Sequence, residues 1–134
     1  MEIDLELNAS QSDVRIEQIY QRLQVTPEQI TAFCQRWKII ELAVFGSVLR
    51  DDFRVAGDDP SDIDLLYVFD SEVSYGFEFF DLKDELEILV NRKVDLVSKQ
   101  GIANSRNWLR RKSILESASN LYLKFHLQGS GNRE

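Results

Sequence analysis

Three aspartates lie beside or within apolar segments of strand length, and their spacing is suited to holding a metal ion. Asp62 and Asp64 flank Ile63 at the start of the apolar run 63–69. Because side chains alternate along a strand, we expect both carboxylates on one face, with Ile63 pointing into the core. Carboxylates held this close raise one another's pKa unless a cation lies between them, and hard oxygen ligands of this kind suit Mg2+.

Asp95 adds a third carboxylate from a second apolar run, residues 94–97. An unpaired charge inside such a strand is costly, so something must compensate it. If this strand lies beside the one that carries Asp64, three carboxylates converge, which is the ligand set that a two-metal displacement at phosphorus requires. Two interpretations without a metal stay open: an exposed acidic strand end for Asp62 and Asp64, and a buried salt bridge for Asp95.

The dipeptide Gly46-Ser47 has features that suit phosphate binding. It closes the apolar run 42–45, and we expect a short helical turn after it. Glycine lets the backbone approach a ligand closely, Ser47 can donate hydrogen bonds from its side chain and amide, and a helix amino terminus favours anionic oxygens. Most Gly-Ser dipeptides are simple turns, so this feature gains weight only together with the aspartates.

The apolar periodicity predicts the elements that must position these residues. It predicts a helix from Asp13 to about Leu23 and a second helix that starts at Pro27, with Thr26 as its N-cap. The only cysteine, Cys34, falls on the apolar stripe of the second helix, which indicates a core thiol rather than a reactive one.

Three strands and two further helices complete the predicted fold. The short apolar runs 42–45, 63–69 and 94–97 predict buried strands. Residues 79–89 have helical periodicity, with Asn91 suited to the left-handed conformation that ends a helix. After a loop near Gln100 and Gly101, the apolar residues of 114–125 predict a last amphipathic helix.

Length, charge and cysteine content bound the class of protein. The chain has 134 residues, 43% hydrophobic and 29% charged, and we expect one domain over 13–127 with an arm at 1–12 and a polar tail at 128–134. The net charge of -7 opposes direct binding to nucleic acid. With one cysteine, no segment like a signal peptide and no apolar run near the roughly 20 residues of a membrane span, we expect a cytoplasmic protein.

Charge is placed unevenly along the chain. Acids crowd residues 51–64, whereas a basic group gathers near the carboxyl end and consists of Arg106, Arg110, Arg111 and Lys112. The basic group is either a solvated face or a contact for a partner or a triphosphate, and both interpretations stay open.

Together these segments resemble the minimal nucleotidyltransferases of the DNA polymerase beta superfamily, whose signature is Gly-Ser, a spacer, Asp-x-Asp and a later strand aspartate. The matching segments are Phe45-Gly46-Ser47-Val48-Leu49-Arg50, Ser61-Asp62-Ile63-Asp64-Leu65-Leu66 and Arg92-Lys93-Val94-Asp95-Leu96-Val97. The likeness extends over residues 27–125. The spacer that contains residues 55–60 is longer than is usual in the family, which bears on acceptor access.

The resemblance implies an α/β (α+β) fold with a small mixed β-sheet flanked by helices, and a magnesium-dependent transfer of a nucleotide. The implied nucleotide-binding residues are Gly46, Ser47, Arg50 and Ser61, and the implied catalytic residues, which also hold two Mg2+ ions, are Asp62, Asp64 and Asp95. The chemistry would be an in-line attack on a nucleoside triphosphate with loss of pyrophosphate. For Arg50, an exposed ion pair with Asp51 or Asp52 is an open alternative.

Chains of this length in the superfamily resemble the antitoxin of a toxin-antitoxin pair whose toxin is an all-helical HEPN ribonuclease. The resemblance implies ATP as donor and a tyrosine of the toxin as acceptor of AMP, and the acidic composition is compatible with a basic partner. One alternative is a non-catalytic antitoxin that acts by occlusion, against which the three intact aspartates argue. Another is transfer to a small hydroxylated molecule, for which the chain is short.

Overall fold

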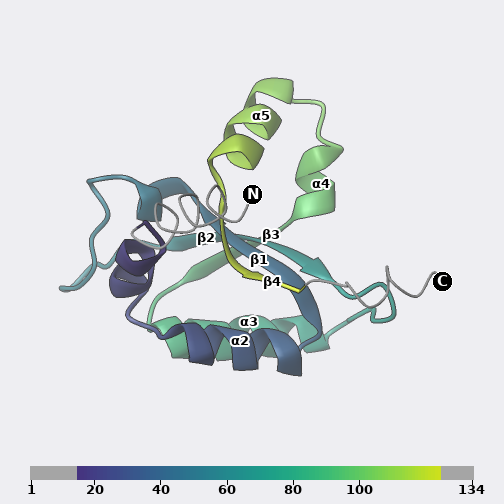
Figure 1. Cartoon of the computed structure of the whole chain (residues 1–134), viewed down its shortest axis with the longest axis horizontal. Coiled ribbons are helices and arrows are strands. Elements are labelled where there is room, and N and C mark those ends of the chain that lie inside the picture. The colour runs from purple at the N-terminus through teal and green to yellow at the C-terminus, as the bar shows by residue number, and fades with distance from the viewer. Residues whose placement is uncertain (1–14, 125–134) are drawn as a thin grey trace, which may run out of the picture.

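The computed structural model describes residues 15–124. The arm predicted at 1–12 and the tail predicted at 128–134 lie outside these residues. In the described part, a four-stranded sheet separates two groups of helices (Figure 1).

The sheet has the strand order β3-β2-β1-β4. Its strands are β1 (Ile39–Phe45), β2 (Ile63–Phe69), β3 (Val94–Ser98) and β4 (Ser119–Leu123). β1 is antiparallel to both β2 and β4, whereas β2 and β3 are parallel and are joined by the crossover helix α3 (Glu78–Val90). The prediction of a small mixed sheet flanked by helices is confirmed, as are the three predicted strands.

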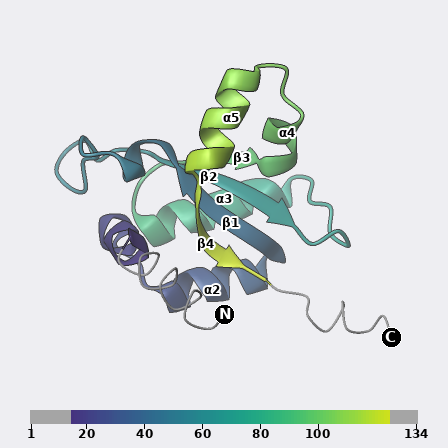
Figure 2. The same cartoon turned by 45° about the horizontal axis from the view of Figure 1, so that its top comes forward.

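The helices divide between the two faces of the sheet. The helix of residues 15–23, α2 (Pro27–Arg36) and α3 cover one face, and α4 (Lys99–Ala103) and α5 (Trp108–Ser117) lie over the other (Figures 1 and 2). α2 begins as predicted, because the Thr26 hydroxyl accepts a hydrogen bond from the amide of Gln29 and the Thr26 amide donates one to Oε1 of Gln29. Asn91, with φ 55, ends α3 in the left-handed conformation.

The core is unequal on the two faces. The larger cluster lies between the sheet and α2, α3 and the first helix, and it includes Cys34, whose burial raises its thiol pKa to about 12. The prediction of a core thiol is therefore confirmed. The smaller cluster holds α4 and α5 to the sheet and consists of Ala43, Phe45, Leu66, Ile102 and Ile114. α5 is thus attached through few buried side chains.

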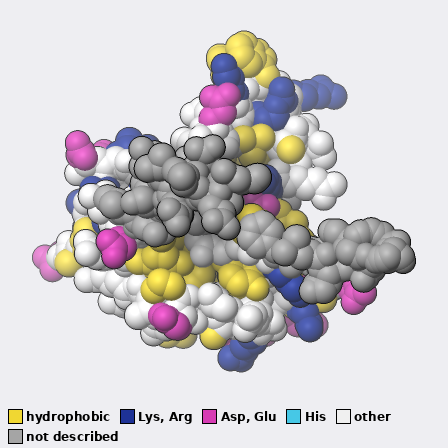
Figure 3. All heavy atoms as spheres, viewed as in Figure 1, with side chains coloured by type: hydrophobic (Ala, Val, Ile, Leu, Met, Phe, Trp, Pro, Cys, Tyr) yellow, Lys and Arg dark blue, Asp and Glu magenta, His cyan; other side chains and the backbone are white. Residues whose placement is uncertain are grey.

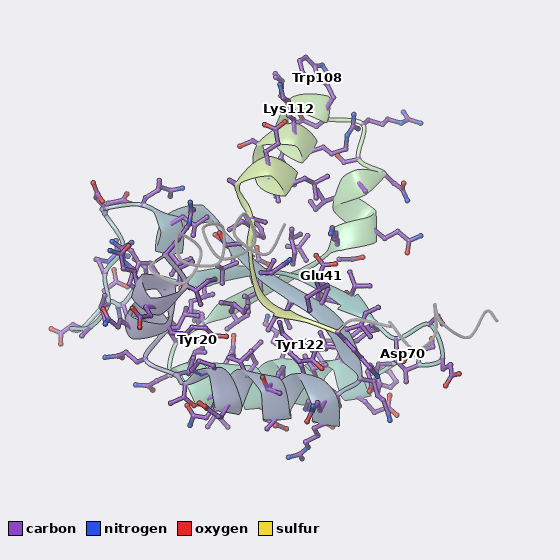
Figure 4. The ribbon with its side chains drawn as sticks, in the orientation of Figure 1. Tyr20, Glu41, Asp70, Trp108, Lys112 and Tyr122 are labelled. Atoms are coloured by element: carbon purple, nitrogen blue, oxygen red, sulfur yellow. The ribbon has the colours of Figure 1, made fainter. Side chains whose placement is uncertain are left out.

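The helix predicted over 114–125 is wrong in its second half. α5 ends at Ser117, and residues 119–123 form β4, which pairs with the edge of β1 left open by β2. Tertiary pairing decides the outcome, because Leu121 and Tyr122 pack on the larger core from a strand and the hydroxyl of Tyr20 donates to the Leu121 carbonyl at 3.0 Å (Figure 4).

The loop predicted near Gln100 and Gly101 is also wrong, because these residues belong to α4. Ser98 caps this helix by accepting a hydrogen bond from the Gly101 amide at 3.2 Å. Lys99, the first residue of α4, pairs with Glu41 of β1 at 2.7 Å and so ties the helix to the sheet.

Candidate active site

Asp64 and Asp95 are direct neighbours on adjacent parallel strands. The register of β2 and β3 pairs Asp64 with Asp95 and Ile63 with Val94. Ile63 and Val94 are buried in the larger core, so the alternation of side chains turns both carboxylates to the opposite face, over which α4 and α5 lie. Asp62 immediately precedes β2 and is exposed, as Asp95 is. The expected neighbourhood of these two strands is confirmed.

Gly46 lies against the Asp64 carboxylate. It follows Phe45, the last residue of β1, which pairs with Asp64 across the sheet. Its φ of +78 lies in the left-handed region, and a β carbon at this position would collide with Oδ2 of Asp64 and lie 3.2 Å from its Cγ. Glycine meets both demands because it has no side chain. The predicted phosphate turn and the predicted carboxylate site therefore meet at one place.

The environment of Asp64 opposes its negative charge. Burial raises the pKa of this carboxyl above its usual range, and the charges of Asp95 and Asp62 raise it further, while Arg50 and Arg110 act in the opposite direction. Two like charges and two cations thus lie within electrostatic reach of one half-buried carboxylate. Such a carboxylate gains from a ligand that brings positive charge.

The turn after Gly46 is a 3-10 helix, η1 (Gly46–Leu49), that is held from the first helix. Arg22 donates hydrogen bonds to the carbonyl of Val48 at 2.9 Å and to that of Arg50. The Ser47 hydroxyl lies 3.4 Å from the Asp62 carbonyl, to which it donates. The sequence analysis missed Arg22, because its partners are backbone carbonyls far along the chain.

Arg50 has an ion-pair partner and also faces the site. Its Nε lies 3.5 Å from Oδ1 of Asp52, and both side chains are exposed. This pair is the alternative left open for Arg50, yet the same guanidinium lowers the pKa of Asp64. An exposed pair of this kind is weak, so it leaves Arg50 free to turn to an anionic ligand.

Ser61, directly before Asp62, closes the long spacer. It is buried, its hydroxyl accepts a hydrogen bond from the Arg54 amide at 2.8 Å, and its own amide donates to the Arg54 carbonyl at 2.9 Å. The spacer is thereby drawn into a closed loop over 54–61. The hydroxyl predicted to contact nucleotide is engaged within the protein.

The same loop is clamped by Arg92, which precedes β3. The buried guanidinium donates to the carbonyls of Arg54 at 3.1 Å, Ser61 at 3.2 Å and Val55, and it lies 5.1 Å from the ring centre of Phe53. Burial lowers the pKa of Arg92. One side chain therefore joins the loop before Asp62 to the strand that carries Asp95. Its role was missed, since no spacing rule marks an arginine that binds carbonyls.

A cleft opens beside the turn, between the end of β1, η1 and α5. Its volume is about 590 Å3, and its lining residues are Arg15, Phe45, Gly46, Leu49, Arg50, Arg110, Ser113, Ile114 and Ser117. The α5 members fall at spacings of three, one and three residues, which places them on one helix face. Three arginines line this cleft, and they suit a polyanionic ligand, whereas Phe45, Leu49 and Ile114 give it apolar walls.

The donor set fits a hard divalent cation, although no closed metal cage is present. Among residues 15–124, no three acidic, histidine or cysteine side chains stand together as a complete metal-ligating group. Asp64 and Asp95 nevertheless share one face on paired strands, and the repulsion between them is what a cation would relieve. Mg2+ is typically held by one or two carboxylates together with substrate phosphates, and this site matches that mode.

Comparison with known proteins agrees with this geometry. Residues 27–120 match the nucleotidyltransferase domain family. A Methanocaldococcus jannaschii protein with the provisional name protein adenylyltransferase is 37% identical over 68 residues, which cover 51% of this chain and 73% of the relative. No helix in the described residues has the length and apolar content to cross a membrane.

Solved structures with a similar fold include minimal nucleotidyltransferases. One, described provisionally as a minimal nucleotidyltransferase, is 33% identical with a TM-score of 0.50 and covers 69% of this chain and 85% of that chain. A tri-AMPylated Shewanella oneidensis HEPN toxin in complex with its MNT antitoxin matches with a TM-score of 0.50 at 17% identity, over 81% of this chain and 77% of that chain, and shows the fold alone. With the family model matching residues 27–120, this chain belongs to the nucleotidyltransferase domain family.

Proposed function

We propose that this protein is a magnesium-dependent adenylyltransferase that moves AMP from ATP to a tyrosine of a HEPN ribonuclease toxin and so neutralises it. The observation that carries the proposal is the contact between Gly46 and Asp64, with Asp95 paired to Asp64. It brings a turn suited to phosphate and a pair of carboxylates together beside an arginine-lined cleft. We place the reaction in the cytoplasm, where ATP is available.

In this proposal, one group of residues binds the triphosphate and another group binds Mg2+. The amide and hydroxyl of Ser47 and the open backbone at Gly46 receive the triphosphate, with Arg50 and Arg110 beside it. Asp62, Asp64 and Asp95 hold Mg2+. When bound, Mg2+ neutralises phosphate charge and lowers the pKa of the acceptor hydroxyl. The Ser61 hydroxyl, predicted to contact nucleotide, also accepts a hydrogen bond from the Arg54 amide and so closes the spacer loop that leads to Asp62.

The proposed transfer of AMP is a single displacement at the α-phosphorus of ATP. The acceptor hydroxyl oxygen forms a bond to the α-phosphorus of ATP, and the bond between that phosphorus and the oxygen that bridges to the β-phosphorus breaks. Pyrophosphate leaves, and in this proposal the hydroxyl proton passes to the carboxylate of Asp95, which is exposed.

The proposal that the acceptor is a HEPN protein is supported by proteins similar to this chain and not by the shape of the cleft. The named activity of the archaeal relative is protein adenylylation, and the Shewanella structure pairs a chain of this fold with an AMPylated HEPN toxin. A protein acceptor fits an open cleft at the edge of a small domain, since no second domain of the described residues covers it.

The test searches the reading frames that neighbour this chain's for a HEPN protein, co-expresses the two proteins and measures the intact HEPN protein by mass spectrometry. We expect mass increments of AMP on a tyrosine with the wild-type chain, and none with the Asp62→Asn/Asp64→Asn variant. Purified wild-type protein should also gain thermal stability from ATP with Mg2+ and lose that gain when Mg2+ is chelated.

A matched control is the Asp81→Asn/Asp84→Asn variant, which makes the same charge change on α3, over the opposite face of the sheet. It should transfer AMP as the wild type does. If the wild-type chain adds no AMP and the variant at Asp62 and Asp64 still rescues growth fully, occlusion without catalysis replaces the proposal.

A further inference from the structure

The outer end of α5 exposes large apolar side chains. Trp108 is 57% exposed and Leu109 is 62% exposed, and both lie in the first turn of the helix. Figure 4 shows Trp108 and Lys112 at the end of α5 that is farthest from the sheet. Adjacent exposed aromatic and aliphatic side chains at a protruding tip are typical of a protein interaction site, whereas surface that binds no partner usually exposes such side chains singly.

The same tip is basic in an acidic protein. Arg106 and Lys112 are exposed beside Trp108 and Leu109, and Figure 3 shows Lys and Arg side chains gathered with apolar ones at this end of the molecule. The chain as a whole carries a net charge of -7. We call the four residues Arg106, Trp108, Leu109 and Lys112 the α5 tip. Its charge suits an acidic surface and is opposite to that of the chain.

The α5 tip adjoins the catalytic cleft through the helix itself. Arg110, Ser113, Ile114 and Ser117 lie on one side of α5 and line the cleft. Leu109 lies one turn before Ser113 on the helix surface and so borders these residues. Trp108 and Lys112, one turn apart from each other, lie beside Leu109 on its other side, turned away from the cleft residues. A protein that sits on the α5 tip therefore lies next to the cleft where the transfer takes place.

We propose that the α5 tip is the docking surface for the acceptor protein, which binds it through an acidic surface with a hydrophobic pocket for Trp108. This inference rests on the proposed function and adds to it the place where the acceptor is held. Trp108 is the anchor, Leu109 widens the apolar contact, and Arg106 and Lys112 steer the acidic partner into place.

A second exposed apolar surface does not compete for this role. Phe77 and Phe80, at the start of α3, are 87% and 63% exposed and lie among the acids Glu78 and Asp81. α3 covers the opposite face of the sheet from α5 (Figure 1). A partner bound there is separated from the cleft by the sheet. The charge around Phe77 and Phe80 is also opposite to that of the α5 tip, so these two residues offer a control that likewise removes two large exposed apolar side chains.

The experiment measures acceptor binding apart from acceptor modification. The HEPN protein is titrated onto the wild-type chain, onto the Trp108→Ser/Leu109→Ser variant and onto the Phe77→Ser/Phe80→Ser control by biolayer interferometry without nucleotide. AMP transfer is then followed at increasing HEPN concentrations, and ATP binding is followed by thermal shift. We expect the Kd and the KM for the HEPN protein to rise ~10-fold or more in the α5 variant only. kcat and the ATP-induced shift should stay unchanged.

Charge is tested separately with Arg106→Glu/Lys112→Glu. We expect slower association for this variant and a weaker dependence of the association rate on salt. If the Trp108→Ser/Leu109→Ser variant binds the HEPN protein as the wild type does, or if only the α3 control weakens binding, the docking inference is overturned while AMP transfer stands. Tip-dependent binding without AMP transfer would support the docking inference and refute the proposed activity.

Two further outcomes would overturn the docking inference. If the wild type does not bind the HEPN protein at all, both proposals fall. If a single-stranded oligoadenylate RNA binds the wild type tightly and the Trp108→Ser/Leu109→Ser variant loses that binding, the α5 tip is an RNA surface and the protein-docking inference is overturned.

Discussion

The backbone of Gly46 packs against the carboxylate of Asp64 so closely that a β carbon at position 46 would lie 3.2 Å from Cγ of Asp64. The turn at the end of β1 and the carboxylate of β2 are therefore one unit. A change at either residue displaces the other, and this coupling leads to the first prediction.

Gly46→Ala should strongly reduce nucleotide transfer while the protein still folds. The added methyl group must push Asp64 away from the turn, and alanine also resists the φ of +78. Transfer measured by AMP incorporation should fall about 100-fold or more, as expected when a reacting group is misplaced. Gly57→Ala is the control, because Gly57 has φ +107 but has no atom within 4 Å of an added β carbon. Equal loss in both variants would assign the effect to backbone strain alone.

Asp62→Asn/Asp64→Asn should raise stability at neutral pH in metal-free buffer. The folded state holds the Asp64 proton more tightly than the unfolded chain does, because burial and neighbouring acids raise the pKa of this carboxyl. Ionised Asp64 therefore costs stability as the pH rises from the ordinary value of 3.8 through the raised one. We expect a gain of about 1–3 °C in Tm at pH 7 with chelator, discounted for solvent screening.

The gain should disappear below pH 3.8, where Asp64 is protonated in both folded and unfolded states. Calorimetry across pH 3 to 8 checks the sign. A double variant less stable than the wild type at pH 7 would contradict the electrostatic account of this site.

Arg92→Gln should destabilise the protein and impair transfer. The substitution leaves the carbonyls of Arg54, Val55 and Ser61 without their buried donor, at a cost of roughly 2–4 kcal/mol in urea unfolding. Arg92→Lys should not restore the wild-type value, because one ammonium cannot span the three carbonyls. The exposed neighbour Lys93 supplies the control, and Lys93→Gln should change the free energy of unfolding by less than about 0.5 kcal/mol.

Arg110→Ala should weaken ATP binding more than it alters the fold. Arg110 lines the cleft and lowers the pKa of Asp64, so its loss removes a cation from the phosphate site and makes the repulsion between carboxylates harder to offset. The KM for ATP should rise about 10-fold, with little change in Tm. Arg36→Ala removes an exposed cation from α2 on the other face and should leave the KM unchanged.

The placement of the candidate-site residues could be predicted where a local pattern determines it. Asp62, Asp64 and Asp95 lie beside or within apolar runs, and the alternation of side chains in those runs predicts which face each aspartate occupies. Gly46 follows another such run, so the strands and the polar residues at them could be predicted from the same pattern. The roles of Arg22 and Arg92 could not be predicted from the sequence, because the backbone carbonyls that they bind come near them only in the completed fold.

The end of the chain shows a second limit. The apolar residues of 114–125 fit a helix as well as a strand, and only the open edge of β1, distant in sequence, makes Ser119–Leu123 a strand. Arg110 was named as one of four basic residues, and its position in the cleft depends on how α5 packs over the sheet, which no local pattern gives.

The pairing of Glu41 with Leu123 in β4 has a consequence for how the protein is made. During synthesis at roughly 5–20 residues per second, β1, β2 and β3 emerge before the strand that completes the sheet beside β1. Until β4 docks, the segment that contains α5 is held to the sheet through β3, through the pair of Lys99 with Glu41 and through the few buried side chains of the smaller cluster. Completion of the sheet beside the cleft therefore waits for a strand that is made after β1, β2 and β3, and it depends on a non-local contact that slows folding.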